Sequence, residues 1–295
     1  MQKLHVRAPA KVNLFLRVVG TRADGYHLID SLMVPVGVWD EVEIEAGGVG
    51  SGGSSSAAIR VECDDPSVPS GEANLAHRAA ALFLRETGAS TEVRIRIAKR
   101  VPVGSGLGGG SSDGAAVLKG LNRLLGSGLS ARRLAAMGAR LGADVPFFVA
   151  CRPARVGGVG EVVTPVDGVR SLWLVIVVPW FSVSTAWAYG RFDEVASPAA
   201  DTGTRIEPFL SGAWPLHDLL VNDLERVVAS RHPEIEGLKR ALLGCGAGGA
   251  VMSGSGSAVF GVFRTRGEAQ RAVQAHSGQR AVFVVKTLTE GGGEA

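Results

Sequence analysis

The chain has 295 residues, of which 46% are hydrophobic and 20% are charged, and its formal net charge is +3. This composition excludes a disordered chain, and a small net charge without a run of Lys or Arg gives no basis for a nucleic-acid surface or a polybasic tail. The length predicts one large domain or two ordinary domains that share a cleft.

The cysteines and the apolar segments limit the cellular compartments in which the protein can work. Cys63, Cys151 and Cys245 are far apart and form no CxxC pair, so they indicate neither a zinc site nor a disulfide framework. Such a set fits a reducing cytoplasm. The first residues contain no apolar signal core, and the longest apolar run, 172–181, is far shorter than the ~20 residues of a membrane-spanning helix. We therefore expect a soluble, cytoplasmic protein.

The first predicted element is a β-hairpin. Residues 11–17 alternate between two faces of a strand. One face carries Lys11, Asn13, Phe15 and Arg17, and the other carries Val12, Leu14 and Leu16. A turn at Asp24-Gly25 and a second extended stretch through Ile44 complete the hairpin. Residues 47–58, which are almost all Gly, Ser and Ala, are expected to form a mobile loop tip.

Helices and strands alternate through the rest of the chain. The pattern predicts helices at 74–84, 112–125 and 130–142, with a strand at 93–97 between the first two. The inward stripe of the second helix is Leu118, Leu121 and Leu125, and Ser130 is the expected N-cap of the third. The later elements are a strand at 172–178, a helix at 233–243, strands at 250–253 and 258–263, a helix at 267–276 and a strand at 281–286. This β-α-β-β-α-β order predicts a ferredoxin-like half, and the Gly-rich end after Glu290 is expected to fray.

The strongest motif is the glycine-rich segment 101–122. Six glycines lie between Gly104 and Gly114 and lead into a helix whose first residues are Ser111, Ser112 and Asp113. Glycines let successive backbone N–H groups point at one place, and a helix N-terminus adds about half a positive charge. Together they form an anion cradle suited to nucleotide phosphates. A serine hydroxyl at this point can contact a phosphate oxygen or its magnesium ion.

Other interpretations of this segment are weaker. Gly104-x-Gly106-x-x-Gly109 matches the dinucleotide-binding fingerprint, but that fingerprint expects an acidic residue about 20 positions later, where residues 128–133 open a helix instead. A Walker A loop ends in Gly-Lys-Ser/Thr, which does not occur here. A purely structural turn does not need so many glycines followed by two serines.

Two further motifs have a structural and a functional interpretation each. Lys11 and Asn13 share a strand face, yet a strand lysine is usually a solvated edge residue. Tyr26 and His27, after the hairpin turn, fit ordinary packing as well as ligand binding. Asp144 lies in the apolar segment LGADVPFF (141–148), where a carboxylate must be paired, act as a helix cap or be functional.

The motifs in combination resemble those of the GHMP kinases. The segment GLGGGSSD (106–113) is similar to their phosphate loop, and GGAVMSGSGSAVFGVF (248–263) to their third glycine motif. PAKVNLFL (9–16), RADGYH (22–27) and LGADVPFF are most like the branch that phosphorylates a cytidine diphosphate-linked polyol in isoprenoid precursor synthesis. The resemblance runs from about Val6 to Lys286, in the family's order and spacing. It implies an α+β fold of two lobes, which we place at 1–151, with the ATP site, and 152–295, ferredoxin-like.

The resemblance also implies roles for individual residues. Asp144 matches the catalytic aspartate that orients and deprotonates the acceptor hydroxyl, and Lys11 matches the lysine beside it. The family's other functional positions correspond here to a set of ATP-binding residues (the ATP group), a set of substrate-binding residues (the substrate group) and a magnesium ligand. The ATP group is Pro102, Gly104, Gly106, Leu107, Gly108, Gly109, Gly110, Ser111, Ser112, Asn74 and Lys99, of which Asn74 and Lys99 lie near the adenosine. The substrate group is Asn13, Tyr26, His27, Thr185 and Tyr189, and the magnesium ligand is Ser112.

Some positions depart from the family pattern. Gly114 stands where alanine is usual, Ala186-Trp187-Ala188 replaces a Pro-containing stretch, and the loop at 47–58 is not a family feature. Two alternatives stay open at this point: a GHMP kinase for a simpler alcohol such as homoserine or mevalonate, and a non-catalytic relative that senses a ligand. The aromatic residues Tyr26 and Tyr189 argue against the first, and Lys11 with Asp144 against the second. A homodimer is left open.

Overall fold

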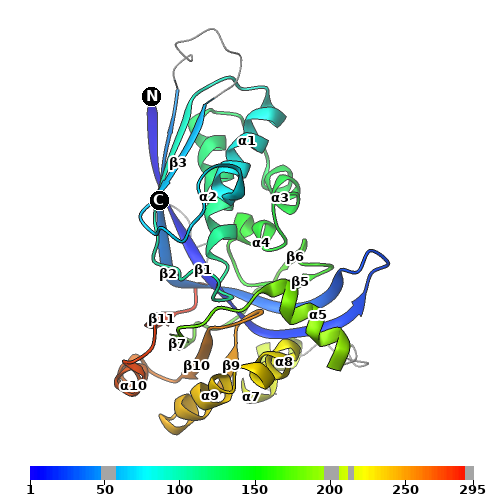
Figure 1. Ribbon diagram of the computed structural model, residues 1–295, viewed down its shortest axis with the longest axis vertical. Helices are drawn as coiled ribbons and strands as arrows, with labels where there is room; N and C mark the ends of the chain where they lie inside the picture. Colours follow the sequence, from blue (N-terminus) through cyan, green and yellow to red (C-terminus); the bar gives the residue numbers. More distant parts are fainter. Residues whose placement is uncertain (48–57, 196–205, 212–215, 290–295) are drawn as a thin grey trace.

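The computed structural model describes residues 1–47, 58–195, 206–211 and 216–289. These residues form two β-sheets, each with helices packed on it (Figure 1). The predicted loop tip falls largely on 48–57 and the predicted frayed end on 290–295, so both lie outside the described residues. In the described part of the chain, no helix combines the length and the apolar character needed to cross a membrane.

The larger sheet is built around one long hairpin. Strands β1 (Gln2–Thr21) and β2 (His27–Ala46) pair antiparallel along their whole length and meet at the predicted Asp24-Gly25 turn. The sheet order is β3-β4-β2-β1-β8, with β5 paired to β2 and β6 paired to β5. The added strands are β3 (Ile59–Cys63), β4 (Val93–Ala98), β5 (Ala154–Gly157), β6 (Val162–Pro165) and β8 (Val221–Asn222).

A bulge in β1 changes the predicted faces of this strand. The pairing with β2 shifts register between Asn13 and Phe15. Phe15 then packs in the same core cluster as Val12 and Leu14, whereas Leu16 belongs to a different cluster. The strict alternation expected for residues 11–17 is therefore wrong after Asn13, because one inserted residue moves every later side chain to the other face.

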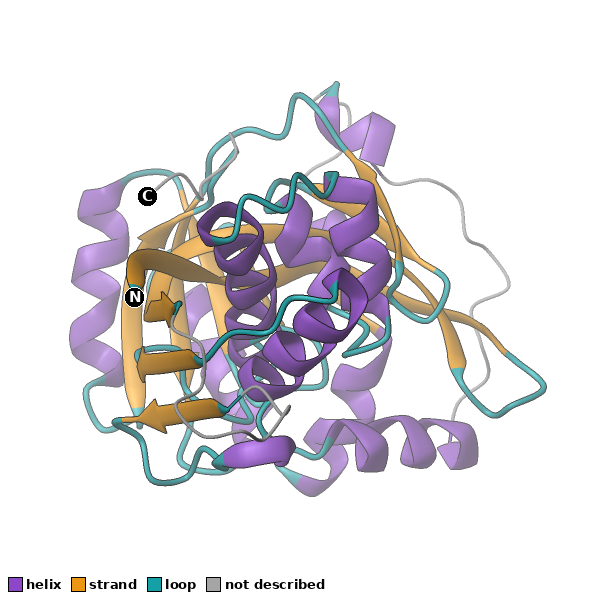
Figure 2. Cartoon of the chain, turned by 90° about the horizontal axis from the view of Figure 1, so that it is seen from above, coloured by secondary structure: helices purple, strands orange, loops and turns teal. Residues whose placement is uncertain are grey.

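Helices cover one face of the larger sheet (Figure 2). They are α1 (Leu75–Thr87), α2 (Gly109–Leu124), α3 (Ala131–Ala139) and α4 (Val145–Ala150), preceded by the short 3₁₀ helix η1 (Gly71–Ala73). Leu118 and Leu121 of α2 are fully buried in the core with Phe83, Phe147 and Ile44. Side chains cap α1 and α3, Asn74 accepting from the N–H of Ala76 and Ser130 from that of Arg133.

The smaller sheet has the order β11-β7-β10-β9, and every neighbouring pair is antiparallel. Its strands are β7 (Trp173–Val178), β9 (Gly249–Met252), β10 (Val259–Phe263) and β11 (Ala281–Lys286). Helix α9 (Glu234–Gly244) packs on β9 and β10, and α10 (Arg266–Val273), followed by η2 (Gln274–His276), packs on β7 and β11. The predicted ferredoxin-like half is confirmed.

The two sheets share several connections. Helices α5 (Thr185–Val195), α6 (Ile206–Leu210), α7 (Leu216–Leu219) and α8 (Asp223–Arg231) lie between β7 and α9 in the chain. Within this stretch β8 returns to pair with β1 in the larger sheet. Strands β5 and β6 also join the larger sheet although they follow residue 152. The division of the chain at 151/152 therefore stays a prediction, and the β-strands themselves do not separate there.

Helix boundaries differ from the predicted ones where glycines are concentrated. Helix α2 begins at Gly109, three residues before the predicted start at Ser112, because tertiary packing overrides the low helix propensity of Gly109 and Gly110. Helix α3 ends at Ala139 rather than near Gly142. The sequence pattern also missed the short elements β3, β5, β6 and α4, which are too short to show a period.

Candidate active site

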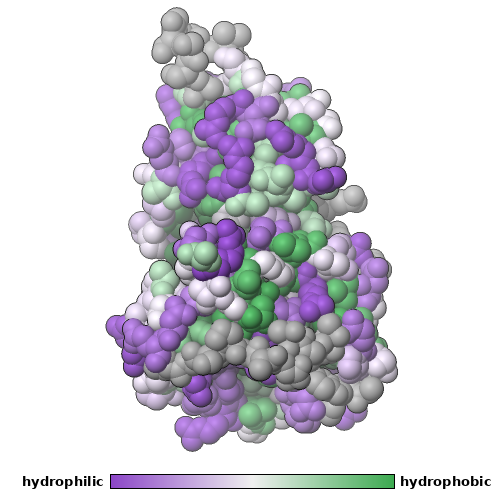
Figure 3. All heavy atoms as spheres, turned by 90° about the vertical axis from the view of Figure 1, so that its right-hand side faces the viewer, coloured by the Kyte–Doolittle hydropathy of each residue, from purple (hydrophilic) through white to green (hydrophobic). Residues whose placement is uncertain are grey.

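A cavity of about 830 Å³ opens between the glycine-rich loop, the turn of the β1–β2 hairpin and α5. Figure 3 views the molecule from the side of this turn, and apolar side chains gather in the middle of that face between two more polar ends. The cavity wall includes every residue predicted for the site except Leu107 and Ser112. Leu107 is instead fully buried in the core. The sequence motifs, which lie as far apart as residues 11 and 189, therefore meet in one place.

Lys11 and Asp144 form the centre of the site. The Lys11 Nζ atom lies 3.7 Å from Asp144 Oδ2 and donates a 2.7 Å hydrogen bond to Asn13 Oδ1. Lys11 is buried, so its interpretation as a solvated edge residue is wrong. Burial lowers the pKa of the Lys11 ammonium, and the Asp144 carboxylate opposes that shift. Asp144 precedes α4 but its side chain caps no N–H group, and it is 28% exposed, so the carboxylate faces the cavity rather than the helix.

Backbone and hydroxyl contacts hold this pair against two loops. The Lys11 N–H donates to the Leu107 carbonyl of the glycine-rich loop at 2.9 Å. Ser253 Oγ accepts from the Asn13 N–H and donates to the Gly106 carbonyl, at 3.4 and 3.3 Å. Asn13 Nδ2 donates to Ser31 at 2.8 Å. The third glycine motif thus packs on both β1 and the glycine-rich loop.

The glycine-rich loop needs glycine at two positions for packing alone. Gly106 and Gly108 have φ of +77°, in the left-handed region. A Cβ at Gly106 would lie 2.2 Å from the Ser253 carbonyl oxygen, and one at Gly108 would lie 2.8 Å from the Phe148 ring. Gly110 differs, since a Cβ there would meet only Leu75, at 3.7 Å. Among the described residues no side chain caps α2, so its first N–H groups beside the cavity are available to an anion.

The two serines after the glycines face different surroundings. Ser111 lines the cavity. Ser112 is only 1% exposed, does not line the cavity, and its hydroxyl has no hydrogen-bond partner among the described residues. Ser112 therefore does not fit the role of magnesium ligand that we expected for it. The described residues also contain no group of three His, Cys, Asp or Glu that could hold a metal ion.

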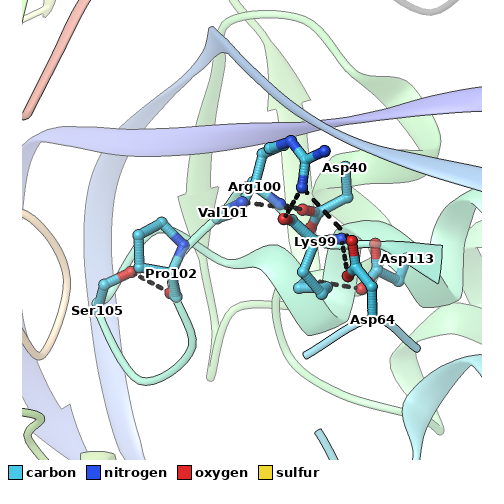
Figure 4. A network of polar contacts seen from close by, with 8 residues as sticks. All are labelled: Asp40, Asp64, Lys99, Arg100, Val101, Pro102, Ser105 and Asp113. Atoms are coloured by element: carbon cyan, nitrogen blue, oxygen red, sulfur yellow. Dashed lines mark hydrogen bonds and ion pairs between the residues drawn. The ribbon is translucent and has the colours of Figure 1, made fainter. Parts of the chain in front are cut away.

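A buried ionic network lies behind the glycine-rich loop (Figure 4). The Lys99 ammonium donates to Asp40 and, at 2.8 Å, to Asp113 of α2. The other oxygen of Asp40 accepts from the N–H groups of Arg100 and Val101, at 2.6 and 2.8 Å. Burial raises the pKa of Asp113 to about 7, although the Lys99 ammonium opposes the shift. Burial would lower the pKa of Lys99, but the two carboxylates raise it. The Lys99 ammonium, expected near the adenosine, is thus held by two carboxylates.

The opposite end of the cavity is aromatic and more open. The rings of His27 and Tyr189 stack with centroids 4.8 Å apart, and His27 Nε2 lies 2.6 Å from Asp193 Oδ1. Tyr26, beside His27 in the turn, is 64% exposed. Burial and the nearby Asp144 raise the pKa of the Tyr189 hydroxyl above its ordinary value. The structure therefore gathers three of the residues predicted to bind the substrate.

Helix α5 contains one of the departures from the family pattern. Ala186-Trp187-Ala188 forms its first turn, and the Trp187 ring lies 4.9 Å from the guanidinium of Arg231. Thr185 and Tyr189 are four residues apart on this helix, so they share a face, and both line the cavity. The Thr185 hydroxyl also hydrogen-bonds Ser255 of the third glycine motif at 2.8 Å.

The sequence reasoning missed Asp40, Asp113 and Asp193. Asp113 sits in a segment of otherwise small residues, a signal similar to the one that drew notice to Asp144, whereas Asp40 is followed by Glu41 and Glu43 and stands out in no such way. Asp193 follows Tyr189 by four residues, and that spacing would have been informative had the helix been predicted.

Comparison with known proteins places these features in context. Family models described as the GHMP kinases N terminal domain and GHMP kinases C terminal match residues 74–152 and 211–279. A protein of Citrifermentans bemidjiense, 4-diphosphocytidyl-2-C-methyl-D-erythritol kinase, is 44% identical over 98% of this chain and 100% of its own. A crystal structure of 4-(cytidine 5'-diphospho)-2C-methyl-D-erythritol kinase has a TM-score of 0.79 and 34% identity, over 96% of this chain and 99% of the other. Homoserine kinase from Cytophaga hutchinsonii shares the fold, with a TM-score of 0.74 at 20% identity over 100% and 97% of the two chains.

Proposed function

The chain belongs to the GHMP kinase family, and from this premise we propose that it transfers the γ-phosphoryl group of ATP to the 2-hydroxyl of 4-diphosphocytidyl-2-C-methyl-D-erythritol. It is an ATP-dependent small-molecule kinase of isoprenoid precursor synthesis, like the relatives that it resembles over nearly its whole length. The observation that carries the proposal is the Lys11–Asp144 pair in a cavity with an anion cradle at one end and an aromatic wall at the other.

Asp144 is the general base of the proposed reaction. Its carboxylate is partly exposed to the cavity, where it can accept the proton of an acceptor hydroxyl. Lys11 forms an ion pair with this carboxylate and stabilises negative charge on the attacking oxygen. Because Asn13 accepts from Lys11 and Ser31 accepts from Asn13, the ammonium is held in one orientation before substrate binds. Phosphoryl transfer depends chiefly on such positioning and on charge stabilisation.

The ATP phosphates lie at the N-terminus of α2 in this proposal. Gly108, Gly109, Gly110 and Ser111 line the cavity there, and their N–H groups can donate to phosphate oxygens. Pro102, Gly104 and Asn74 complete this end, with the Asn74 side chain engaged as the cap of α1. Magnesium would enter with the nucleotide, where it shields the charge of the phosphates. Ser112 does not fit as its ligand, because the residue is buried and does not line the cavity.

The cytidine lies against His27, Tyr189 and Tyr26 in this proposal. Aromatic faces suit a nucleobase, whereas homoserine or mevalonate offers no ring to stack on them. The Lys11–Asp144 pair argues against a ligand sensor, since binding alone needs no base beside the phosphate cradle. We further propose that the enzyme works in the cytoplasm, which is supported by the absence of a disulfide at Cys63, Cys151 and Cys245.

A substrate panel tests this function. Purified protein, ATP and magnesium would be offered the diphosphocytidyl substrate, free methylerythritol, homoserine and mevalonate, and products would be identified by mass spectrometry. Stacking is worth ~1–3 kcal/mol per base and each polar contact ~0.5–1.5 kcal/mol. At about 1.4 kcal/mol per decade, the diphosphocytidyl substrate should have a kcat/KM roughly a hundredfold or more above that of free methylerythritol. Equal values for the two would remove the cytidine pocket and leave only the broader kinase assignment.

A further inference from the structure

Helix α5 holds the His27 side chain with three residues of one face. Phe192 and Asp193 lie three and four residues after Tyr189, so all three side chains project from the same side of the helix. Tyr189 stacks on the imidazole, Phe192 meets it edge-on with centroids 6.3 Å apart, and Asp193 contacts Nε2 at 2.6 Å. The His27 side chain is consequently only 8% exposed although it lies beside the turn of a hairpin.

The carboxylate of Asp193 determines which ring nitrogen of His27 carries a proton. An ionised carboxylate only accepts hydrogen bonds, so Nε2 must be the donor. In the neutral imidazole, Nδ1 is then a hydrogen-bond acceptor. The nearest charged neighbours on the same helix do not compete, since Arg191 pairs with Glu194. Asp193 lines the same cavity as His27 and Tyr189.

We propose that Asp193 is a positioning residue for the acceptor substrate, which acts through His27 to favour a base bearing an exocyclic amine. With the proton fixed on Nε2, the Nδ1 acceptor suits the amino group of cytosine and disfavours uracil, which has a carbonyl oxygen at the same place. The stacked Tyr189 ring restrains the imidazole plane, so the acceptor is set before substrate arrives. This inference rests on the proposed function and adds a determinant of its base specificity.

Kinetics of Asp193→Ala test the proposal, with Glu194→Ala as the matched control. Glu194 is the adjacent acidic residue of α5 and pairs with Arg191 rather than with His27. We expect Asp193→Ala to raise the KM of the diphosphocytidyl substrate at least tenfold while kcat and the KM of ATP stay within twofold. Glu194→Ala should match the wild type. Equal KM values for the two variants would overturn the inference and leave the proposed function intact, whereas a wild type without activity on this substrate would remove that function.

Two further measurements separate positioning from a purely structural role. Calorimetry would give the dissociation constant of UDP divided by that of CDP. This ratio should fall at least fivefold in both Asp193→Ala and Asp193→Asn. The asparagine amide can donate to Nε2 as well as accept from it, so it no longer fixes the proton on that nitrogen. In a His27→Ala background, Asp193→Ala should have no additional effect, because its action passes through the imidazole. An unchanged UDP/CDP ratio in folded variants, or additive effects of the two substitutions, would overturn the proposal.

Discussion

The two ends of the cavity are built in different ways. At the glycine-rich end, Lys99, Asp40 and Asp113 are buried, and Asp40 is held by the Lys99 ammonium and by two backbone N–H groups. At the α5 end, Tyr26 and Asp193 are largely solvent-exposed, although the His27 side chain that Asp193 contacts is buried. A buried charge network fails if one member is lost, whereas exposed side chains can be exchanged at little cost to the fold. Replacing a side chain of the buried network at the phosphate end should therefore destabilise the fold. Replacing an exposed side chain at the acceptor end should cost little stability.

The largest expected effect lies where the two ends meet, at Asp144. We expect Asp144→Asn to lower kcat by roughly 10²–10⁴, the usual contribution of a positioned general base, while the fold and ATP affinity are kept. Single-turnover kinetics with the diphosphocytidyl substrate, together with calorimetry for ATP, would measure both. A kcat near that of the wild type in pure, folded protein would show that the reaction does not depend on this carboxylate.

Removing one member of the buried network tests the contrast in stability directly. Lys99→Met leaves Asp40 and Asp113 without their shared cation, and breaking a buried ion pair from one side costs about 3–5 kcal/mol of unfolding free energy. The matched variant at the other end is Arg22→Met, which breaks the exposed pair with Asp24 and should cost less than about 1 kcal/mol. Urea unfolding of both proteins measures the difference. Equal losses would mean that the two ends are built alike.

The pH dependence of stability should come from the phosphate end. In the folded chain Asp113 has a pKa of about 7, against an ordinary value of 3.8. Between these values the folded state keeps a proton that the unfolded state loses, so the unfolding free energy falls as pH rises from about 4 to 7 and then levels off. Since one pKa unit corresponds to about 1.4 kcal/mol, the fall is on the order of 1 kcal/mol or more. Asp113→Asn should flatten this part of the profile in thermal unfolding, and a profile identical to the wild type would exclude Asp113 as its source.

The smallest expected effect concerns a glycine that the cradle does not need. A Cβ at Gly114 would lie 3.5 Å from the Leu75 carbonyl oxygen, an ordinary contact, and the residue is inside α2. Gly114→Ala should therefore raise the unfolding free energy by about 0.5–1 kcal/mol through helix propensity. Gly106→Ala is the contrasting variant, because its Cβ would collide with the Ser253 carbonyl. Thermal unfolding should move in opposite directions for the two, and a destabilised Gly114→Ala would show that the helix start is packed more tightly than its contacts indicate.

The sequence predicted the residues of the cavity better than their contacts. Lys11, His27, Asp144 and Tyr189 were found because motifs report residue type and spacing, and the cavity contains all four. The partners of Lys99 were not found, because Asp40 is 59 positions away and nothing local marks the pairing. The face of Phe15 was wrong for a related reason, since a bulge depends on the pairing with the next strand rather than on the strand itself. Contacts between residues that are far apart in the chain cannot be predicted from a single sequence.

The contact between Asn13 and Ser253 has a consequence for synthesis on the ribosome. These residues meet across 240 positions of chain, and Gly254 lies against the Lys11 ammonium so closely that a Cβ would approach Nζ to 3.0 Å. At about 5–20 residues per second, Lys11 and Asn13 emerge roughly 10–50 s before the loop that completes their surroundings. A polypeptide cut short before residue 250 would carry the phosphate cradle without its cover. Kinase activity is therefore delayed until nearly the whole protein has been made, and nascent fragments should bind no nucleotide productively.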